Sequence, residues 1–391
     1  MTMAADKQDK VLNVPTLRFP EFRGGWGKYK VSDVLDFYST NSLSWDQLEY
    51  NSDELLNLHY GLIHVGLPTI VNLDENVLPN IKKEFLPKNY ELCREGDVAF
   101  ADASEDTNEV AKAIEFVNLS DKNVVCGLHT IHGRDNHNLT SIGFKGYAFA
   151  SESFHNQIRR IAQGTKIFSI SSKNFSECYI GIPSKDEQTK IAKLLALIDE
   201  RISTQSRVID KLQSLMKGLA EHLTEFTPNI KIADCLNCHS SVLQENQVKS
   251  EGKYKVYGAN GICGYSDKPA ILEDAILIVK DGSGVGNVSY ASGEYSVIGT
   301  SNYLTAKSGY SLKYLYYSLM VFNFIPYKTG MAIPHIYFKD YRKALIYCPS
   351  LDKQVQIASL LSKIECKIEA DKAIADFYQQ QKRFLLQSMF I

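Results

Sequence analysis

The chain has 391 residues, of which 44% are hydrophobic and 23% are charged, and its formal net charge is −2. A chain of this length favours two domains, and its composition excludes a wholly disordered protein. The near-neutral charge excludes a uniformly basic nucleic-acid-binding protein, so any contact with DNA must come from local patches or from partners.

The sequence carries no recognisable targeting or membrane signal. No apolar run reaches the length of a membrane span, and Met1–Lys10 lacks the apolar core of a secretion signal. We therefore expect a cytoplasmic protein that does not bind membranes. Its eight cysteines include only one close pair, and in that compartment most should be reduced, partly buried thiols.

After an N-terminal segment at residues 1–29, a first domain is expected at residues 30–179, and its charge is unevenly divided. Residues 30–121 contain 18 acidic and 6 basic side chains, whereas residues 122–175 contain 2 acidic and 7 basic ones. The later stretch is the candidate DNA-contacting surface, since its polar and basic side chains can donate to base edges or phosphates. The candidates are His129, His132, Arg134, Asn136, His137, Asn138, Arg159, Arg160, Lys166 and Lys173. An ordinary solvated loop is the alternative, and the acidic stretch is expected on the outer or partner-facing surface.

A long helix is expected within residues 180–228. Its apolar positions alternate in steps of four and three, which is the pattern of a coiled-coil seam, and the seam is polar only at Gln205. The seam residues include Ile191, Leu195, Ile198, Ile202, Ile209 and Leu212. Ser184-x-x-Glu187 indicates a capping box at the start, and Pro228 marks the end. A helix of roughly 40 residues would span about 60 Å.

Cys235-Leu-Asn-Cys238-His239 has the spacing used for covalent haem attachment and could also form part of a metal site. In the internal repeat described below, Cys235 aligns with Val34 and Cys238 with Phe37, which favours two small core residues instead. The sequence therefore predicts no metal site.

The second domain is expected at residues 229–345 and is rich in glycine. A hydrophobic strand at Ala275–Val279 runs into Lys280-Asp-Gly-Ser-Gly-Val-Gly-Asn287, where glycines permit tight turns and close backbone approach to a ligand. The candidate DNA-contacting residues are Tyr257, Asn260, Lys280, Ser283, Asn287, Lys328, His335 and Lys339. A β-hairpin stabilised by its own turns is the alternative. Strands should dominate both domains.

A second helix, expected within residues 346–391, repeats the first at an offset of 166 residues. The repeated residues begin with Gly164 and Ile167 against Gly330 and Ile333, and continue with Lys173, Pro183, Ser184, Asp186, Gln188, Ile191, Ala192, Leu194, Leu195 and Ile198 against Lys339, Pro349, Ser350, Asp352, Gln354, Ile357, Ala358, Leu360, Leu361 and Ile364. The second seam includes Ile357, Leu361, Ile364 and Ile368, with Asp371 as the counterpart of Gln205.

A weaker echo aligns residues 30–35 with 231–236, while the sequences that follow look unrelated. The repeat thus predicts one duplicated frame with two different inserts. The two helices should pair in antiparallel fashion, because the chain must leave one, build a domain and return. The alternative is that each is a core helix of its own domain. The expected fold class is α+β, with two mainly β domains joined by an antiparallel coiled coil.

Motifs that would carry catalysis are missing. No proline is followed by another, which excludes the Asn/Asp-Pro-Pro-aromatic motif of amino-methyltransferases. The glycine run that ends at Asn287 is not followed by the Gly-Lys-Ser/Thr of a phosphate-binding loop. We expect no catalytic residues.

The duplicated frame resembles the specificity subunit of type I restriction-modification enzymes. The resemblance rests on the opening Val14-Pro-x-Leu17-Arg18-Phe19-Pro20-Glu21-Phe22-x-Gly-x-Trp26 and on the two Pro-Ser-x-x-x-Gln-x-x-Ile-Ala-x-Leu-Leu helices. The Tyr254-x-Val-Tyr-Gly-x-Asn-Gly-Ile-x-Gly-Tyr265 segment also looks like a recurrent class of target recognition domain.

The resemblance implies a non-catalytic subunit whose two target recognition domains each bind one half of a split, asymmetric double-stranded DNA sequence, with the helices as a spacer. It implies two methylation subunits that carry S-adenosylmethionine for adenine-N6 methylation, and restriction subunits that carry ATP and Mg²⁺. This chain would bind no cofactor itself. A coiled-coil adaptor with two unrelated binding modules is the competing hypothesis.

Overall fold

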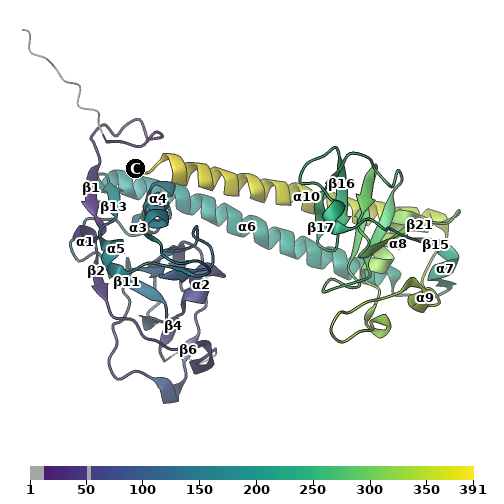
Figure 1. Cartoon of the computed structure of the whole chain (residues 1–391), viewed down its shortest axis with the longest axis horizontal. Helices are drawn as coiled ribbons and strands as arrows, with labels where there is room; N and C mark the ends of the chain where they lie inside the picture. The colour runs from purple at the N-terminus through teal and green to yellow at the C-terminus, as the bar shows by residue number, and fades with distance from the viewer. Residues whose placement is uncertain (1–12, 51–53) are drawn as a thin grey trace, which may run out of the picture. The chain divides into compact units, whose positions relative to one another are not determined.

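The computed structural model describes residues 13–50 and 54–391, so the expectation for Met1–Lys10 falls outside the described residues. The chain forms two compact units. The first contains the chain up to Thr204 together with Ala375–Ile391, and the second contains Gln205–Ile374. Helices α6 (Lys185–Thr224) and α10 (Leu351–Ser388) each contribute residues to both units (Figure 1). The domain boundaries expected from the sequence stay a prediction.

The first unit contains a five-stranded sheet, β2-β11-β7-β9-β5, and a four-stranded sheet, β10-β4-β6-β3. Two small antiparallel pairs, β1-β13 and β12-β8, complete its strands. The strands are β1 Gly27–Lys30, β2 Asp36–Tyr38, β3 Leu48–Glu49, β4 Leu56–Leu58, β5 Ile70–Asn72, β6 Asn80–Ile81, β7 Val98–Ala101, β8 Ala103–Ser104, β9 Ala113–Asn118, β10 Val124–Cys126, β11 Thr130–Arg134, β12 Phe168–Ser169 and β13 Tyr179–Ile182. The short helices are α1 Val31–Val34, α2 Tyr60–His64, α3 Phe144–Phe149, α4 Glu152–Ile161 and α5 Ser172–Ser176, with 3-10 turns η1 Trp45–Gln47 and η2 Lys83–Phe85.

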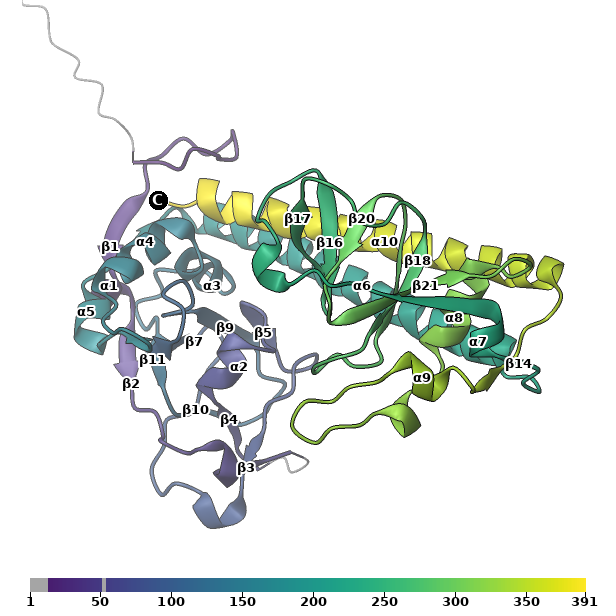
Figure 2. The same cartoon turned by 45° about the vertical axis from the view of Figure 1, so that its right-hand side comes forward.

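The second unit contains a four-stranded sheet, β15-β21-β18-β19, a three-stranded sheet, β17-β16-β20, and the pair β14-β22 (Figure 2). The strands are β14 Ile230–Lys231, β15 Leu236–Ser240, β16 Tyr254–Gly258, β17 Gly261–Ser266, β18 Ala275–Val279, β19 Val288–Ala291, β20 Tyr295–Val297, β21 Ser301–Ala306 and β22 Leu345–Ile346. The helices are α7 Ile232–Cys235, α8 Leu312–Met320 and α9 Phe338–Tyr341, with 3-10 turns η3 Glu245–Gln247 and η4 Ile325–Tyr327. Strand β18 has the bounds expected from the sequence.

The two units share a ladder of four antiparallel strands, although their sequences there look unrelated. The order β2-β11-β7-β9 in the first unit corresponds to β15-β21-β18-β19 in the second. A parallel pair accompanies each ladder, β4 with β10 and β16 with β20. The two inserts are thus variants of one architecture, because backbone hydrogen bonds define a ladder whichever side chains it carries.

Repeated residues make the same contacts in both units. The Gln188 side chain accepts a hydrogen bond from the Ser141 backbone N–H at 2.6 Å and donates to the Pro183 carbonyl at 2.9 Å. Gln354 accepts from the Ser311 N–H at 2.9 Å and donates to the Pro349 carbonyl at 2.8 Å. Each glutamine therefore fixes the start of a long helix to its own domain. In each unit, the glutamine side chain thereby pairs a backbone N–H and a proline carbonyl that would otherwise lack a hydrogen-bond partner.

The seam positions predicted for both helices are buried or half-buried. In the first unit, Leu195 and Ile198 of α6 share a core with Leu385 of α10 and with Met389, which directly follows α10. In the second unit, the core contains Ala220 from the C-terminal part of α6 and Ala358 and Leu361 from the N-terminal part of α10. Opposite ends of the two helices meet in each unit, so the helices pair in antiparallel fashion. The expected fold class is confirmed.

Glu187 was expected to cap the start of α6, but its carboxylate instead binds side chains of the N-terminal segment. Its carboxylate accepts hydrogen bonds from Nε and Nη2 of Arg18, both at 2.7 Å, and from Nε1 of Trp26 at 3.3 Å. The opening Val14-to-Trp26 motif is thereby attached to the start of α6.

Among the described residues, no helix combines the length and the hydrophobicity needed to cross a membrane.

Candidate nucleic-acid interface

Two loops lie side by side at the end of the central strand in each unit. In the first unit, β8 pairs with β12, and the Ile170 N–H donates to the Asp102 carbonyl at 3.0 Å. In the second, Asp281 forms a bridge with His335, and the Ile336 N–H donates to the Lys280 carbonyl at 2.9 Å. We name these loop pairs the first edge (residues 102–109 and 163–170) and the second edge (residues 280–287 and 328–336).

A glycine forms the turn in one loop of each edge, and the two glycines occupy equivalent positions in the internal repeat. Gly164 and Gly330 have φ values of +144° and +88°. A Cβ at Gly164 would overlap the Ile167 carbonyl oxygen, and a Cβ at Gly330 would overlap that of Ile333. The repeated Gly-x-x-Ile motif therefore encodes a closed turn that only glycine allows.

The second edge brings together most of the candidates predicted in the second domain. Lys280, Ser283 and Asn287 lie on one of its loops, and Lys328 and His335 lie on the other. The Lys328 amino group lies next to Gly286, and the backbone of Ala259 lies next to Gly284, so the turn that carries the exposed Asn260 adjoins the edge. These donors face solvent or are half-exposed, which suits contact with a phosphate or a base edge.

Tyr257 and Lys339 stand apart from this group. The Tyr257 ring contacts Tyr295 edge to face at 5.5 Å and packs against a buried apolar cluster. Lys339 lies on α9, with its amino group 5.0 Å from the centre of the Tyr337 ring. Neither residue belongs to the second edge.

The first edge borders a hollow of about 420 Å³. It is lined by Tyr60, His64, Ala103, Ser104, Glu105, His129 and Ile167. Of the predicted residues, His129 lines it directly and exposed Lys166 precedes Ile167. His129 Nδ1 lies 3.1 Å from Asp102 Oδ1, and its ring contacts Tyr60 at 5.3 Å. Tyr60, His64 and Ser104 were not predicted, because only the fold brings them to His129.

His132 and Arg134 are corrections to the predicted surface. Their exposed fractions are 1% and 5%, and both side chains bind the buried carboxylate of Asp97. His132 Nε2 lies 2.7 Å from Asp97 Oδ2, and Arg134 donates to both oxygens of Asp97 at 2.8–2.9 Å. Burial alone would raise the pKa of Asp97, but the hydrogen bonds from His132 and Arg134 lower it below its usual value. These two residues therefore support the interior and are not available to DNA.

Asn136, His137 and Asn138 lie at the other end of strand β11 from His129. At about 3.3 Å per residue, the seven steps along the chain from His129 to Asn136 would place these groups roughly 23 Å apart in an extended strand. Asn136 donates to Asp36 and to Tyr38, each at 2.7 Å. Asn138 accepts from Lys185 at 3.0 Å. The predicted first surface is therefore divided between two places.

The remaining candidates of the first domain lie on helices α4 and α5. Arg159 forms an ion pair with Glu152 and also donates to Asn156 and Asn108, so several of its donor groups are already occupied. Arg160 and Lys173 are exposed. Of the two adjacent arginines, Arg160 is therefore the better candidate for a phosphate contact.

The acidic stretch expected on the outer surface contributes to the first edge. Asp102, Glu105 and Asp106 flank β8, which pairs with β12. Asp102 contacts His129, and Glu105 lines the same hollow as His129 and Ile167. The prediction is corrected here, because the ladder brings the loop after β7 back toward the basic segment. Carboxylates at such a place can accept hydrogen bonds from base amino groups.

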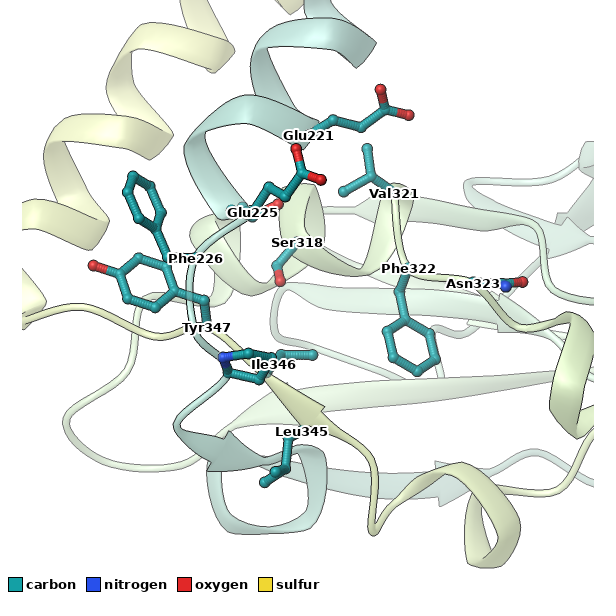
Figure 3. A pocket seen from close by; sticks show the side chains of 12 residues that line it. Glu221, Glu225, Phe226, Ser318, Val321, Phe322, Asn323, Leu345, Ile346 and Tyr347 are labelled. Atoms are coloured by element: carbon teal, nitrogen blue, oxygen red, sulfur yellow. The ribbon is translucent and has the colours of Figure 1, made fainter.

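A pocket of about 430 Å³ in the second unit is unrelated to either edge (Figure 3). It is lined mainly by apolar side chains such as Phe226, Phe322 and Tyr347, with Glu221 and Glu225 at its rim. None of the predicted DNA-contacting residues lines it. Its two carboxylates disfavour a phosphate ligand.

Cys235, Cys238 and His239 do not converge on a common point. Cys235 is fully buried at the end of α7, whereas Cys238 and His239 are neighbours on β15 and must point to opposite faces. His239 stacks on Tyr303 and binds Thr305 Oγ1 at 3.1 Å. Burial raises the pKa of Cys235 to about 12 and that of Cys238 to about 11.

Comparisons with known proteins agree with this arrangement. The family model described as the type I restriction modification DNA specificity domain matches twice, at residues 88–214 and 230–376. A putative type I specificity subunit of Mycoplasma genitalium is 30% identical over 197 residues, which is 45% of this chain and 50% of that protein. The specificity subunit of the type I restriction enzyme EcoprrI of Escherichia coli is 24% identical over 112 residues, 29% of this chain and 28% of that one. The chain thus spans half or less of the length of these curated relatives.

Solved structures show the same fold. A crystal structure of a type I restriction-modification S subunit from M. genitalium has a TM-score of 0.61 at 18% identity, covering 97% of this chain and 99% of that one. A structure concerned with complex assembly and conformational transition of the type I R-M system has a TM-score of 0.55 at 15% identity, covering 94% and 97%.

Proposed function

Because the chain belongs to the type I restriction modification DNA specificity domain family, we propose that it is the DNA-specificity subunit of a type I restriction-modification complex. Each unit would bind one half of a split, asymmetric target in double-stranded DNA. The observation that carries the proposal is the pair of edges, which share one backbone geometry and present different side chains.

The difference between the edges explains why the two half-sites would differ. The first edge offers Lys166 and a group of carboxylates, with His129 beside it, whereas the second edge offers Lys280, Lys328 and the amide of Asn287. Lysines bind phosphates or guanine, and amides bind adenine. Contacts to the phosphate backbone would supply affinity, and contacts to base edges would supply specificity.

The outer faces of the long helices would bind two methylation subunits. Leu197, Val208 and Leu215 are exposed on α6, and their spacing places them on one face of that helix. Phe377 and Phe384 form a similar exposed stripe on α10, where they are 66% and 57% exposed. Exposed apolar stripes of this kind are typical of protein interfaces.

The partner subunits would carry out the catalytic reactions. The methylation subunits would carry S-adenosylmethionine and methylate an adenine at N6 in each half-site, and the restriction subunits would carry ATP and Mg²⁺. This chain would act as the non-catalytic subunit that positions both on DNA.

The salt dependence of DNA binding tests the proposal against an adaptor with two unrelated modules. We expect the purified chain with its methylation subunits to bind target DNA with an affinity that falls steeply as salt rises, because phosphate contacts release counterions. An adaptor would give weak binding that salt hardly changes, and that result would refute the proposal. Lys217→Ala, on the exposed surface of α6, is a control that should leave the salt dependence unchanged.

A further inference from the structure

Three metal-ligating side chains converge in the interior of the first unit. Cys93, Cys126 and His132 are all buried, and the two sulfurs and a ring nitrogen of His132 lie within 4.8 Å of one another. The two sulfurs are 3.6 Å apart. Two sulfurs bound to one tetrahedral zinc ion at about 2.3 Å would lie about 3.8 Å apart, whereas a disulfide requires about 2.05 Å.

The histidine is prepared for a ligand on its second nitrogen. Its Nε2 is bound to Asp97 Oδ2 at 2.7 Å, while its buried Nδ1 has no hydrogen-bond partner. When Nε2 carries the proton that Asp97 accepts, Nδ1 presents a lone pair. A carboxylate that orients a histidine through the opposite nitrogen is the usual support of a metal-bound imidazole. An unpaired buried nitrogen is otherwise costly.

The second unit shows that the fold does not require polar groups at this place. Strand register places Ile271 and Val297 where the first unit has Cys93 and Cys126. It likewise places Tyr303 where the first unit has His132. Ile271, Val297 and Tyr303 belong to an apolar cluster, together with Ala275, the counterpart of Asp97. Ordinary packing therefore suffices in the second unit, and the polar set is particular to the first.

We propose that Cys93, Cys126 and His132 form a zinc-binding site inside the first recognition domain. Binding would release the two thiol protons to solvent and form two S–Zn bonds and one N–Zn bond, with a water molecule as the fourth ligand. Two thiolates neutralise the divalent cation, and Asp97 neutralises Arg134. Arg134 also binds Glu91 at 2.6 Å, but the Glu91 side chain is 31% exposed, so its charge is partly solvated. The fully buried groups around the site are thus balanced in charge, as low-dielectric surroundings require.

The site would join the two sheets of the first unit. Cys126 ends β10 of the four-stranded sheet, and His132 lies in the middle of β11 of the five-stranded sheet. Cys93 is attached to β10 by its N–H, which donates to the Val124 carbonyl at 2.8 Å. A cation held by all three would fix the turn at residues 127–129. The distant positions 93, 126 and 132 form no sequence motif, which is why the sequence predicted no metal site.

Metal analysis of the full-length chain tests this site. The background should carry Cys263→Ser and Cys366→Ser, because these two thiols are exposed and can bind zinc adventitiously. We expect about one zinc per chain in this background, and at least a tenfold loss in Cys126→Val or His132→Tyr, which install the residues found in the second unit. Cys178→Ser removes another buried thiol of the same unit and should retain the metal.

Cobalt substitution of the background protein gives a readout that does not depend on the folding of the Cys126→Val or His132→Tyr variants. The background protein loaded with Co²⁺ should show thiolate-to-cobalt charge transfer and the visible bands of a tetrahedral site. Absence of both bound zinc and these bands would overturn the proposal. So would equal metal content in Cys126→Val, or a Cys93–Cys126 disulfide found by peptide mass analysis of protein purified without reductant.

Discussion

Gly164 and Gly330 show how a single residue closes each edge, and their effect can be separated from backbone strain. Gly330 and Gly309 both have φ of +88°, but a Cβ would overlap the Ile333 carbonyl only at Gly330. A left-handed conformation costs an L-residue roughly 1–2 kcal/mol. We expect Gly309→Ala to lower the free energy of unfolding by that amount, and Gly330→Ala by at least about 1 kcal/mol more. Denaturant unfolding measures both, and equal losses would show that the turn is not closed as described.

Single cations at the edges should affect one half-site each. We expect Lys280→Ala or Lys328→Ala to weaken recognition of the second half-site only, and Lys166→Ala that of the first only. Loss of a base contact costs about 1–3 kcal/mol, a factor of roughly 5 to 150 in affinity. Competition binding with DNAs altered in one half-site measures the effect. A variant that weakens both half-sites equally would contradict the assignment of one edge to each.

Residue-level prediction from the sequence was uneven for a physical reason. The candidates of the second edge were found because lysines and glycines follow a recognisable strand, Ala275–Val279. His132 and Arg134 were misplaced, because their polarity suggested a surface while their actual partner, Asp97, lies about 35 residues earlier in the chain. Buried polar networks of this kind have no local pattern in the sequence.

At the scale of elements, the two long helices were predictable because one spacing rule determines their packing. Apolar residues spaced alternately four and three positions apart form a stripe that packs against a partner helix. This spacing runs along the whole of the 40-residue α6 and the 38-residue α10. The common ladder of the inserts was not predictable. Strand pairing depends on backbone hydrogen bonds between distant segments, and corresponding strands such as β7 (Val-Ala-Phe-Ala) and β18 (Ala-Ile-Leu-Ile-Val) share little sequence.

Two adjacent residues of α6 allow the packing between the long helices to be tested separately from the binding of a methylation subunit. Ile198 is 5% exposed in the seam, whereas Leu197 is 48% exposed on the outer face. Ile198→Asp should destabilise the first unit by roughly 3 kcal/mol or more, since an unpaired buried charge is expensive. Leu197→Asp should change stability by less than about 0.5 kcal/mol but weaken binding of a methylation subunit. Thermal unfolding measures the loss of stability, and sedimentation of the mixed subunits measures binding. An equal loss of stability in both variants would show that Ile198 is not buried in a seam between the two helices.

At the scale of the whole molecule, duplication accounts for most of the architecture. Each unit has the same ladder, the same glycine turn and the same glutamine contact at the start of a long helix. The edges differ in charge, and only the first unit contains the Cys93, Cys126 and His132 set. A duplicated frame with diverged edges is what a subunit for an asymmetric target would need.

The most direct measurement is genome-wide mapping of N6-methyladenine in a host that carries this chain with its methylation subunits. Two diverged edges predict one split motif, with two unlike parts separated by unspecified bases and one methylated adenine in each part. The Lys280→Ala variant should relax the bases of one part and leave the other intact. An uninterrupted motif, or methylation that does not depend on this chain, would contradict the account.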